Sequence, residues 1–159
     1  MEVPALSNDR ASAFAPLPPD RLARWSRFGI WETVFFPQFL GMQLEELKQD
    51  YARMRLSYKP ELRQPAGVWH GGVIATMLDT VVVPAIGSGY DEPRALFTID
   101  MQLRYLDPIG EEDAVAEGWV ARRGRQIVYC DAEVRAATGR LAATATLTYK
   151  VSSRVQELA

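Results

Sequence analysis

The sequence has few of the residues that catalytic triads and metal sites require. Its 159 residues include one cysteine, Cys130, and one histidine, His70. A disulfide within the chain and a CxxC metal motif are therefore excluded, as is a zinc site with two histidines from one chain. A Ser-His-Asp or Cys-His mechanism confined to one chain would have to use His70. Carboxylates, hydroxyls and backbone groups remain as candidates for chemistry.

The chain also lacks a charge excess and a long apolar run. Eighteen Lys and Arg residues against twenty Asp and Glu give a net charge of −2. This charge offers no global basic field for nucleic acid or for an anionic membrane. No apolar run approaches the roughly 18–20 residues of a membrane span. The first twenty residues contain charges and four prolines but no apolar stretch of a secretory signal, so we expect a cytoplasmic protein.

The length and patterning predict one domain with a short extension at each end. We expect an N-terminal arm and helix over residues 1–38, the domain over 39–152 and a tail over 153–159. The N-terminal helix is predicted to begin at Asp20, a plausible N-cap, and to end near Pro37. Its apolar face is predicted from residues spaced by three, which are Leu22, Trp25, Phe28 and Trp31.

Alternating apolar and polar residues predict six strands, joined by short turns into an antiparallel sheet. The expected strands are residues 41–47, 51–58, 96–106, 114–121, 127–136 and 141–151. Within 96–106, Phe97 and Ile99 are predicted to share the face of Met101, with Thr98 on the opposite face.

A helix is predicted between the second and third strands. From Gly72 onward its apolar residues occupy nearly every side of the helical wheel, which is typical of a helix in the interior of a domain. Pro84 is predicted to kink or end it. The sequence therefore indicates an α+β domain in which an antiparallel sheet wraps one long buried helix.

Asp79 is the polar exception within this apolar helix. A buried carboxylate must be paired, neutralised or exposed to a cavity, and such groups gather at functional sites as well as in structural pairs. His70-Gly71-Gly72 lies where the helix begins, and helix N-termini present unpaired N–H groups that can polarise a carbonyl. Because seven residues of helix span about 10 Å, Asp79 cannot serve the start of its own helix. We therefore expect a two-fold homodimer with composite sites.

The segment Gly67-Val-Trp-His70-Gly71-Gly72, followed by Asp79, resembles the signature of hotdog-fold acyl-CoA thioesterases of the PaaI-like, phenylacetate-degradation type. The similarity extends from about Phe39 to Val151. It includes the Thr98-Ile-Asp-Met run, the Leu106-Asp-Pro108 strand end and the Arg-Arg-Gly124-Arg125 turn. The resemblance implies a hotdog fold and the hydrolysis of acyl-CoA thioesters. Coenzyme A is then part of the substrate, and the reaction needs no metal and no bound cofactor.

The resemblance also implies roles for single residues. Asp79 matches the acidic residue that acts as general base or nucleophile. Gly71 matches the glycine whose N–H polarises the thioester carbonyl. Thr98 matches a hydroxyl residue that helps position the attacking water, and Gln64 matches an amide position that orients water or the thioester. His70 matches a residue with a mainly structural role, which we group with Gly72 among the substrate-binding residues at the helix start.

Coenzyme A carries several phosphate charges, so cationic residues are expected near the pocket mouth. The turn formed by Arg123, Gly124 and Arg125 is the best candidate, although turns of proteins are often charged without binding anything. Val73, Met77 and the aromatic residues of the N-terminal helix are expected to line the acyl pocket. The sequence leaves both a homodimer and a homotetramer, formed by two such dimers, open.

Other functions remain open from the sequence. A non-catalytic hotdog protein would bind acyl-CoA or a fatty acid without turnover. A hydratase or dehydratase on the same fold would need an Asp/His pair, whereas His70 here precedes the glycines. A purely structural protein is disfavoured, because an inert core position favours Leu or Ala over Asp79.

Overall fold

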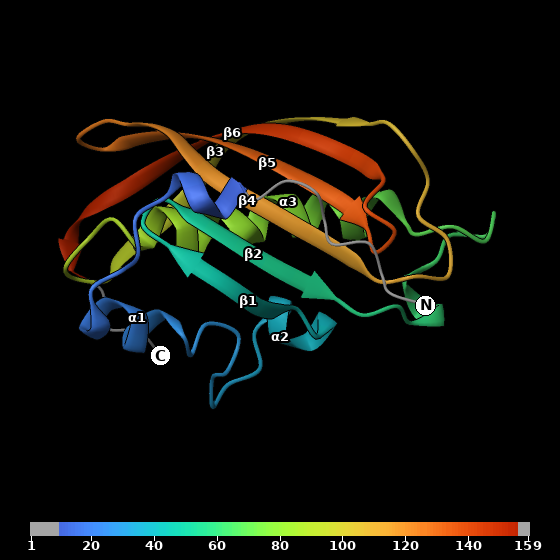
Figure 1. The fold of residues 1–159 in the computed structure, drawn as a ribbon, viewed down its shortest axis with the longest axis horizontal. Coiled ribbons are helices and arrows are strands. Elements are labelled where there is room, and N and C mark those ends of the chain that lie inside the picture. Colours follow the sequence, from blue (N-terminus) through green and yellow to red (C-terminus); the bar gives the residue numbers. More distant parts are fainter. Residues whose placement is uncertain (1–9, 156–159) are drawn as a thin grey trace.

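The computed structural model describes residues 10–155, in which a long helix, α3, packs on one face of a six-stranded antiparallel sheet (Figure 1). The strand order across the sheet is β1-β2-β4-β5-β6-β3. The elements in chain order are η1 (Arg10–Ala13), α1 (Pro19–Trp25), α2 (Phe36–Leu40), β1 (Gln43–Lys48), β2 (Tyr51–Leu56), η2 (Pro60–Leu62), α3 (Gly71–Gly87), β3 (Arg94–Tyr105), β4 (Ala114–Arg123), β5 (Ile127–Ala136) and β6 (Leu141–Val155). The predicted α+β arrangement is confirmed.

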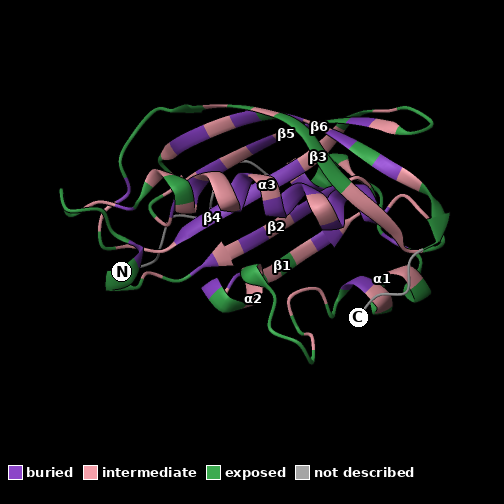
Figure 2. Ribbon diagram, turned by 180° about the vertical axis from the view of Figure 1, so that it is seen from behind, coloured by how far each residue is buried: buried purple, intermediate pink, exposed green. Residues whose placement is uncertain are grey.

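Helix α3 is buried because its side chains are apolar on almost every side. Ten of its 17 residues are buried, and Figure 2 shows the helix lying against the concave side of the sheet. Gly118 of β4 makes this close approach possible. A Cβ atom there would lie 2.8 Å from Val81 Cγ1 and 2.9 Å from Val82 Cγ1, which is closer than two carbon atoms pack.

Of the two outcomes predicted for Pro84, a kink or an end of the helix, the structure excludes the end. The helix continues through Pro84 to Gly87. A proline inside a helix removes one internal hydrogen bond, and the buried residues on both sides of Pro84 hold the helix against the sheet despite that loss.

The predicted N-terminal helix from Asp20 to near Pro37 is also wrong, because the chain forms two short helices there. Helix α1 starts at Pro19 with Pro18 as its N-cap, and it ends at Trp25. Gly29 then adopts a left-handed backbone conformation with φ of 87°, which no helix continues through. Pro37 lies in the first turn of α2, where a proline is favoured, rather than at a helix end.

The six strands lie where the alternation predicts them, with ends that differ by a few residues. Strand β6 extends to Val155, beyond the predicted domain end at residue 152. Residues 1–9 of the predicted N-terminal part (1–38) and residues 156–159 of the predicted tail (153–159) lie outside the described residues, so the division into arm, domain and tail stays a prediction. No helix within residues 10–155 is long and apolar enough to cross a membrane.

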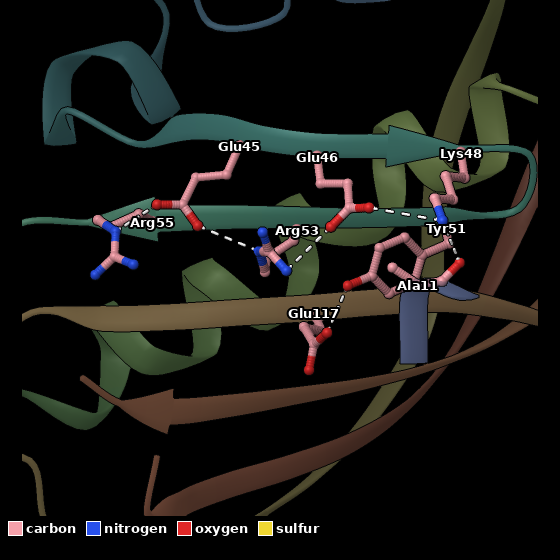
Figure 3. Close-up of polar contacts among 8 residues, drawn as sticks. All are labelled: Ala11, Glu45, Glu46, Lys48, Tyr51, Arg53, Arg55 and Glu117. Carbon is pink, nitrogen blue, oxygen red and sulfur yellow. Dashed lines mark hydrogen bonds and ion pairs between the residues drawn. The ribbon is translucent and has the colours of Figure 1, made fainter. Parts of the chain in front are cut away.

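The outer face of β1 and β2 carries a polar network, shown in Figure 3. Glu45 pairs with Arg53 at 3.2 Å, and Lys48 donates to the carbonyl oxygen of Ala11 at 2.7 Å. Pairs between partly exposed side chains contribute about 0–1 kcal/mol each. Their main consequence is positional: residues 10–13 are tied to the outer face, while α3 and the candidate site lie on the inner face.

Candidate active site

Asp79 lies near the middle of α3, and its carboxylate is held by two hydroxyl groups. Thr98 Oγ1 donates to Asp79 Oδ1 at 2.9 Å, and the Tyr149 hydroxyl donates to the same oxygen. The Tyr149 hydroxyl also lies 2.8 Å from the main-chain carbonyl oxygen of Asp79. Within residues 10–155, both side-chain bonds end on Oδ1, and Oδ2 has no hydrogen-bond partner. The carboxylate is therefore fixed in orientation with one oxygen left for chemistry.

A β-bulge turns Thr98 toward this carboxylate. In the pairing of β3 with β6, Thr98 lies opposite Tyr149 and Asp100 lies opposite Thr148, so the pairing skips Ile99. Residues before the bulge consequently change face relative to those after it. Simple alternation placed Thr98 on the face opposite to Met101, and this part of the prediction is wrong. Both residues face α3, whereas Phe97 and Ile99 are exposed by 57% and 56%.

Tyr149 contacts the candidate catalytic carboxylate, and the sequence analysis missed it. It is 2% exposed. Burial, and then the nearby charge of Asp79, raise the pKa of the Tyr149 hydroxyl well above its usual value of 10, so it remains a hydrogen-bond donor. The available signal was a tyrosine on the inward face of the last strand, because a buried tyrosine hydroxyl usually requires a partner. That signal does not say which residue is the partner.

His70 acts as the N-cap of α3 through its side chain. Its Nδ1 atom accepts a hydrogen bond from the Gly72 N–H at 2.9 Å, which supports the structural reading of this histidine. The same bond occupies the Gly72 amide. The Gly71 N–H, in contrast, makes no hydrogen bond within residues 10–155. Of the two glycine amides at the helix start, only that of Gly71 is free for a ligand oxygen.

The Gly71 amide lies at a small cavity of about 340 Å³. Gln64 and Tyr105 line the same cavity, and the Tyr105 hydroxyl donates to the Gly71 carbonyl oxygen at 2.7 Å. The structure therefore brings Gln64 and Gly71 together, as the prediction for these two residues requires.

The predicted residues Asp79 and Gly71 do not meet within one chain. They are separated by eight residues of continuous helix, which corresponds to about 12 Å. The chain thus carries two half-sites: a carboxylate with Thr98 and Tyr149 at mid-helix, and a free amide with Gln64 at the helix start.

Comparison with known proteins finds a similarity to one superfamily. The profile of the thioesterase superfamily matches residues 66–143. A protein from Saccharolobus solfataricus that is provisionally classed as an esterase is 26% identical over 113 residues, covering 71% of this chain and 75% of that protein. Residues 66–143 are thus similar to the thioesterase superfamily, as the sequence analysis expects.

Solved structures show that the fold is the hotdog fold. The PaaI protein from the phenylacetic acid degradation operon of E. coli superposes with a TM-score of 0.74 at 16% identity, over 84% of this chain and 95% of that chain. A hypothetical thioesterase from Streptococcus pneumoniae, crystallised with coenzyme A, gives a TM-score of 0.67 at 18% identity, over 74% and 94% of the two chains. The predicted resemblance and fold are confirmed, and the similarity supports a thioester hydrolase in general.

The segment that matches the superfamily contains part of each half-site. Gly71, Asp79 and Thr98 lie within residues 66–143, whereas Gln64 precedes that segment and Tyr149 follows it. Asp79 therefore lies inside the matched segment, whereas Tyr149, the buried donor to its carboxylate, lies outside it.

The predicted coenzyme A turn lies at the opposite end of α3 from Gly71. Arg123 donates to the carbonyl oxygen of Ile86 at 3.0 Å and pairs with Asp50, so its guanidinium is used within the chain. Gly124 forms the tight turn between β4 and β5, where a Cβ atom would lie 2.7 Å from the carbonyl oxygen of Ile127. Arg125 is exposed on this turn. The role of these residues toward coenzyme A stays a prediction.

Proposed function

We propose that the protein hydrolyses acyl-CoA thioesters to a free carboxylic acid and coenzyme A. The observation that carries the proposal is the Asp79 carboxylate, which lies in an otherwise apolar helix with Oδ1 bound by Thr98 and Tyr149 and with Oδ2 unpaired. Asp79 is half-buried, whereas its helix neighbours Leu78 and Thr80 are buried, so a ligand can reach the carboxylate. Similarity to the thioesterase superfamily supports the same reaction.

The chemistry follows from the two half-sites. The Gly71 N–H donates a hydrogen bond to the thioester carbonyl oxygen and stabilises the negative charge that develops there. Oδ2 of Asp79 takes a proton from water as the water oxygen attacks the carbonyl carbon, or it attacks that carbon directly and forms a mixed anhydride, which water then hydrolyses to the free acid and the Asp79 carboxylate. In both routes the carbon–sulfur bond breaks after the attack, and the coenzyme A thiolate leaves and is protonated. Both routes need a fixed carboxylate, and Thr98 and Tyr149 provide it.

The reaction requires both half-sites at one thioester, so we propose a two-fold homodimer in which Asp79 acts beside Gly71 of the partner subunit. Strand β3 supports this arrangement, because among residues 10–155 it pairs only with β6 and forms an edge of the sheet. Its residues Phe97 and Ile99 are exposed, and long apolar edge strands favour pairing with another chain. Pairing of β3 with its symmetry mate would cover these side chains and extend the sheet across both subunits.

Coenzyme A is proposed as the carrier of the acyl group. The structural relative from Streptococcus pneumoniae was crystallised with coenzyme A, and the exposed Arg125 of this chain offers a cation for its phosphates. Assignment to the PaaI-like type and a cytoplasmic location are part of the same proposal.

The test is release of free thiol from a panel of acyl-CoA substrates, with wild type, Asp79→Asn and Asp100→Asn measured together. Asp100 is a matched control, because it is an exposed aspartate two positions from Thr98 and faces away from α3. We expect Asp79→Asn to lower kcat by about 100-fold or more and Asp100→Asn to leave it near wild type. Full activity of Asp79→Asn would contradict the proposal, and acyl-CoA binding without turnover by wild type would indicate a binding protein instead.

A further inference from the structure

A second and larger cavity lies between the N-terminal segment and the seam of α3 and β3. Its volume is about 710 Å³, within the range of about 300–1,000 Å³ that is usual for small-molecule sites. One wall comes from residues 23–32, and the other from Val83 of α3 and from Arg94 and Leu96 of β3. The wall formed by residues 23–32 lies outside the segment that matches the superfamily.

The cavity lies on the same side of both elements as the candidate catalytic carboxylate. Val83 follows Asp79 by four residues on α3, so the two side chains lie on one helix face about 6 Å apart along the axis. Leu96 precedes Thr98 by two residues on β3, in the regular stretch before the bulge, so these side chains also share a face. The cavity therefore lies on the same face of α3 and of β3 as Asp79 and Thr98, one helical turn and two strand residues away from them.

The N-terminal wall contains three aromatic rings, beside the charged residues Arg24, Arg27 and Glu32. Phe28 and Trp31 meet edge to face with ring centroids 5.1 Å apart, and Phe28 lies 5.9 Å from Trp25. Trp25 is buried against α3 where Gly87 leaves room for its ring, since a Cβ atom at that position would lie 1.8 Å from Trp25 Cζ2. Trp25 thus fixes the aromatic wall to the C-terminal end of α3, the same helix that carries Asp79.

We propose that this cavity binds the acyl group of the thioester and makes the protein selective for large apolar acyl groups. The inference rests on the proposed hydrolysis of acyl-CoA. At about 30 Å³ for each water-sized group, the cavity has room for on the order of twenty such groups, so a short acyl group leaves most of the aromatic wall uncovered. Each methylene buried there favours binding by about fourfold.

The first experiment compares kcat/KM for butyryl-CoA, dodecanoyl-CoA and phenylacetyl-CoA, and the last two distinguish a chain from a ring. We expect one or both large substrates to exceed butyryl-CoA by about 100-fold or more. Val83→Phe fills the cavity and should lower this ratio by about 10-fold or more. Val34→Phe is the matched control, because Val34 is exposed by 62% and does not line the cavity. The ratio is expected to be unchanged in Val34→Phe.

A second pair of variants covers the case in which Val83→Phe does not fold. Trp31→Ala removes a half-buried ring from the cavity wall, and Phe39→Ala removes an aromatic ring that is exposed by 73% outside the cavity. Trp31→Ala should lower the ratio of large to short substrates, whereas Phe39→Ala should not. Equal ratios in wild type, Val83→Phe and Trp31→Ala would overturn the inference.

Binding of non-hydrolysable thioethers separates this inference from the proposed reaction. S-dodecyl-CoA should bind wild type more tightly than S-butyl-CoA by calorimetry, and Val83→Phe should reduce the difference. If this holds in the absence of any hydrolysis, the cavity assignment stands and the proposed reaction fails. If hydrolysis occurs while the two thioethers bind equally, the cavity assignment fails and the proposed reaction stands.

Discussion

Replacing Tyr149 by phenylalanine tests the central contact of the site without changing the carboxylate. The variant removes a hydroxyl group that contacts both Oδ1 and the carbonyl oxygen of Asp79, and its ring is 2% exposed, so no water replaces it without rearrangement. A hydrogen bond to a charged group contributes about 1.5–3 kcal/mol. For a domain of this size, 1 kcal/mol corresponds to about 2–4 °C in Tm, so we expect Tyr149→Phe to lower Tm by about 3–12 °C.

The assay is thermal and urea unfolding followed by circular dichroism. Tyr129→Phe is the matched control, because Tyr129 is a tyrosine of the neighbouring strand β5 that is exposed by 48%. Its Tm should remain within about 2 °C of wild type, since surface substitutions usually change stability by less than about 0.5 kcal/mol. Equal Tm values for wild type and Tyr149→Phe would refute the reasoning.

A double-mutant cycle with Asp79→Asn shows whether the effect passes through this contact. If the tyrosine stabilises the fold by bonding to the ionised carboxylate, the two substitutions should be non-additive by about 0.5–3 kcal/mol. Additive losses would mean that Tyr149 stabilises the protein by packing alone.

Three further predictions concern other parts of the molecule. Burial raises the pKa of the Cys130 thiol from 9.0 to about 12 and raises those of Tyr51 and Tyr149 above 10. The folded state therefore keeps protons that the unfolded chain loses. The stability that these groups contribute should be fully present below about pH 9 and should fall at higher pH by up to about 1.4 kcal/mol per pH unit for each titrating group. Equal urea midpoints at pH 8 and pH 11 would contradict this prediction. Gly118→Ala should destabilise the protein by about 1–3 kcal/mol in urea unfolding, because its Cβ would overlap α3, and unchanged stability would mean that the helix shifts freely. Arg125→Ala should raise KM for acyl-CoA about two- to fivefold at low salt and less at high salt, whereas a salt-independent KM would exclude a phosphate contact.

The sequence was sufficient for the parts of the fold that depend on periodicity. Helix α3 was predicted because its apolar residues leave no polar face, and the strands because they alternate over many residues. The N-terminal region was predicted wrongly because residues spaced by three, such as Trp25 and Phe28, look helical whether or not the chain turns between them. Gly29 turns the chain there, and its positive φ depends on packing that the pattern does not contain.

The candidate site could be predicted only for residues with local signals. Asp79 and Gly71 stand out in sequence, as a charge in an apolar helix and as a glycine at a helix start. Tyr149 does not, because its contact with Asp79 joins positions 70 residues apart. Gln64 could be named from the family resemblance, but its place beside Gly71 needed the folded loop.

The bulge at Ile99 means that the site depends on a choice between two strand alignments. In the observed alignment, the pairing of β3 with β6 skips Ile99 and places Thr98 opposite Tyr149. An unbroken alignment from Asp100 onward would place Ile99 opposite Tyr149 and turn Thr98 to the outside. The group beside the carboxylate would then be an aliphatic side chain rather than a hydroxyl. One skipped residue therefore decides whether the same sequence presents a hydrogen-bond donor or a hydrocarbon to Asp79.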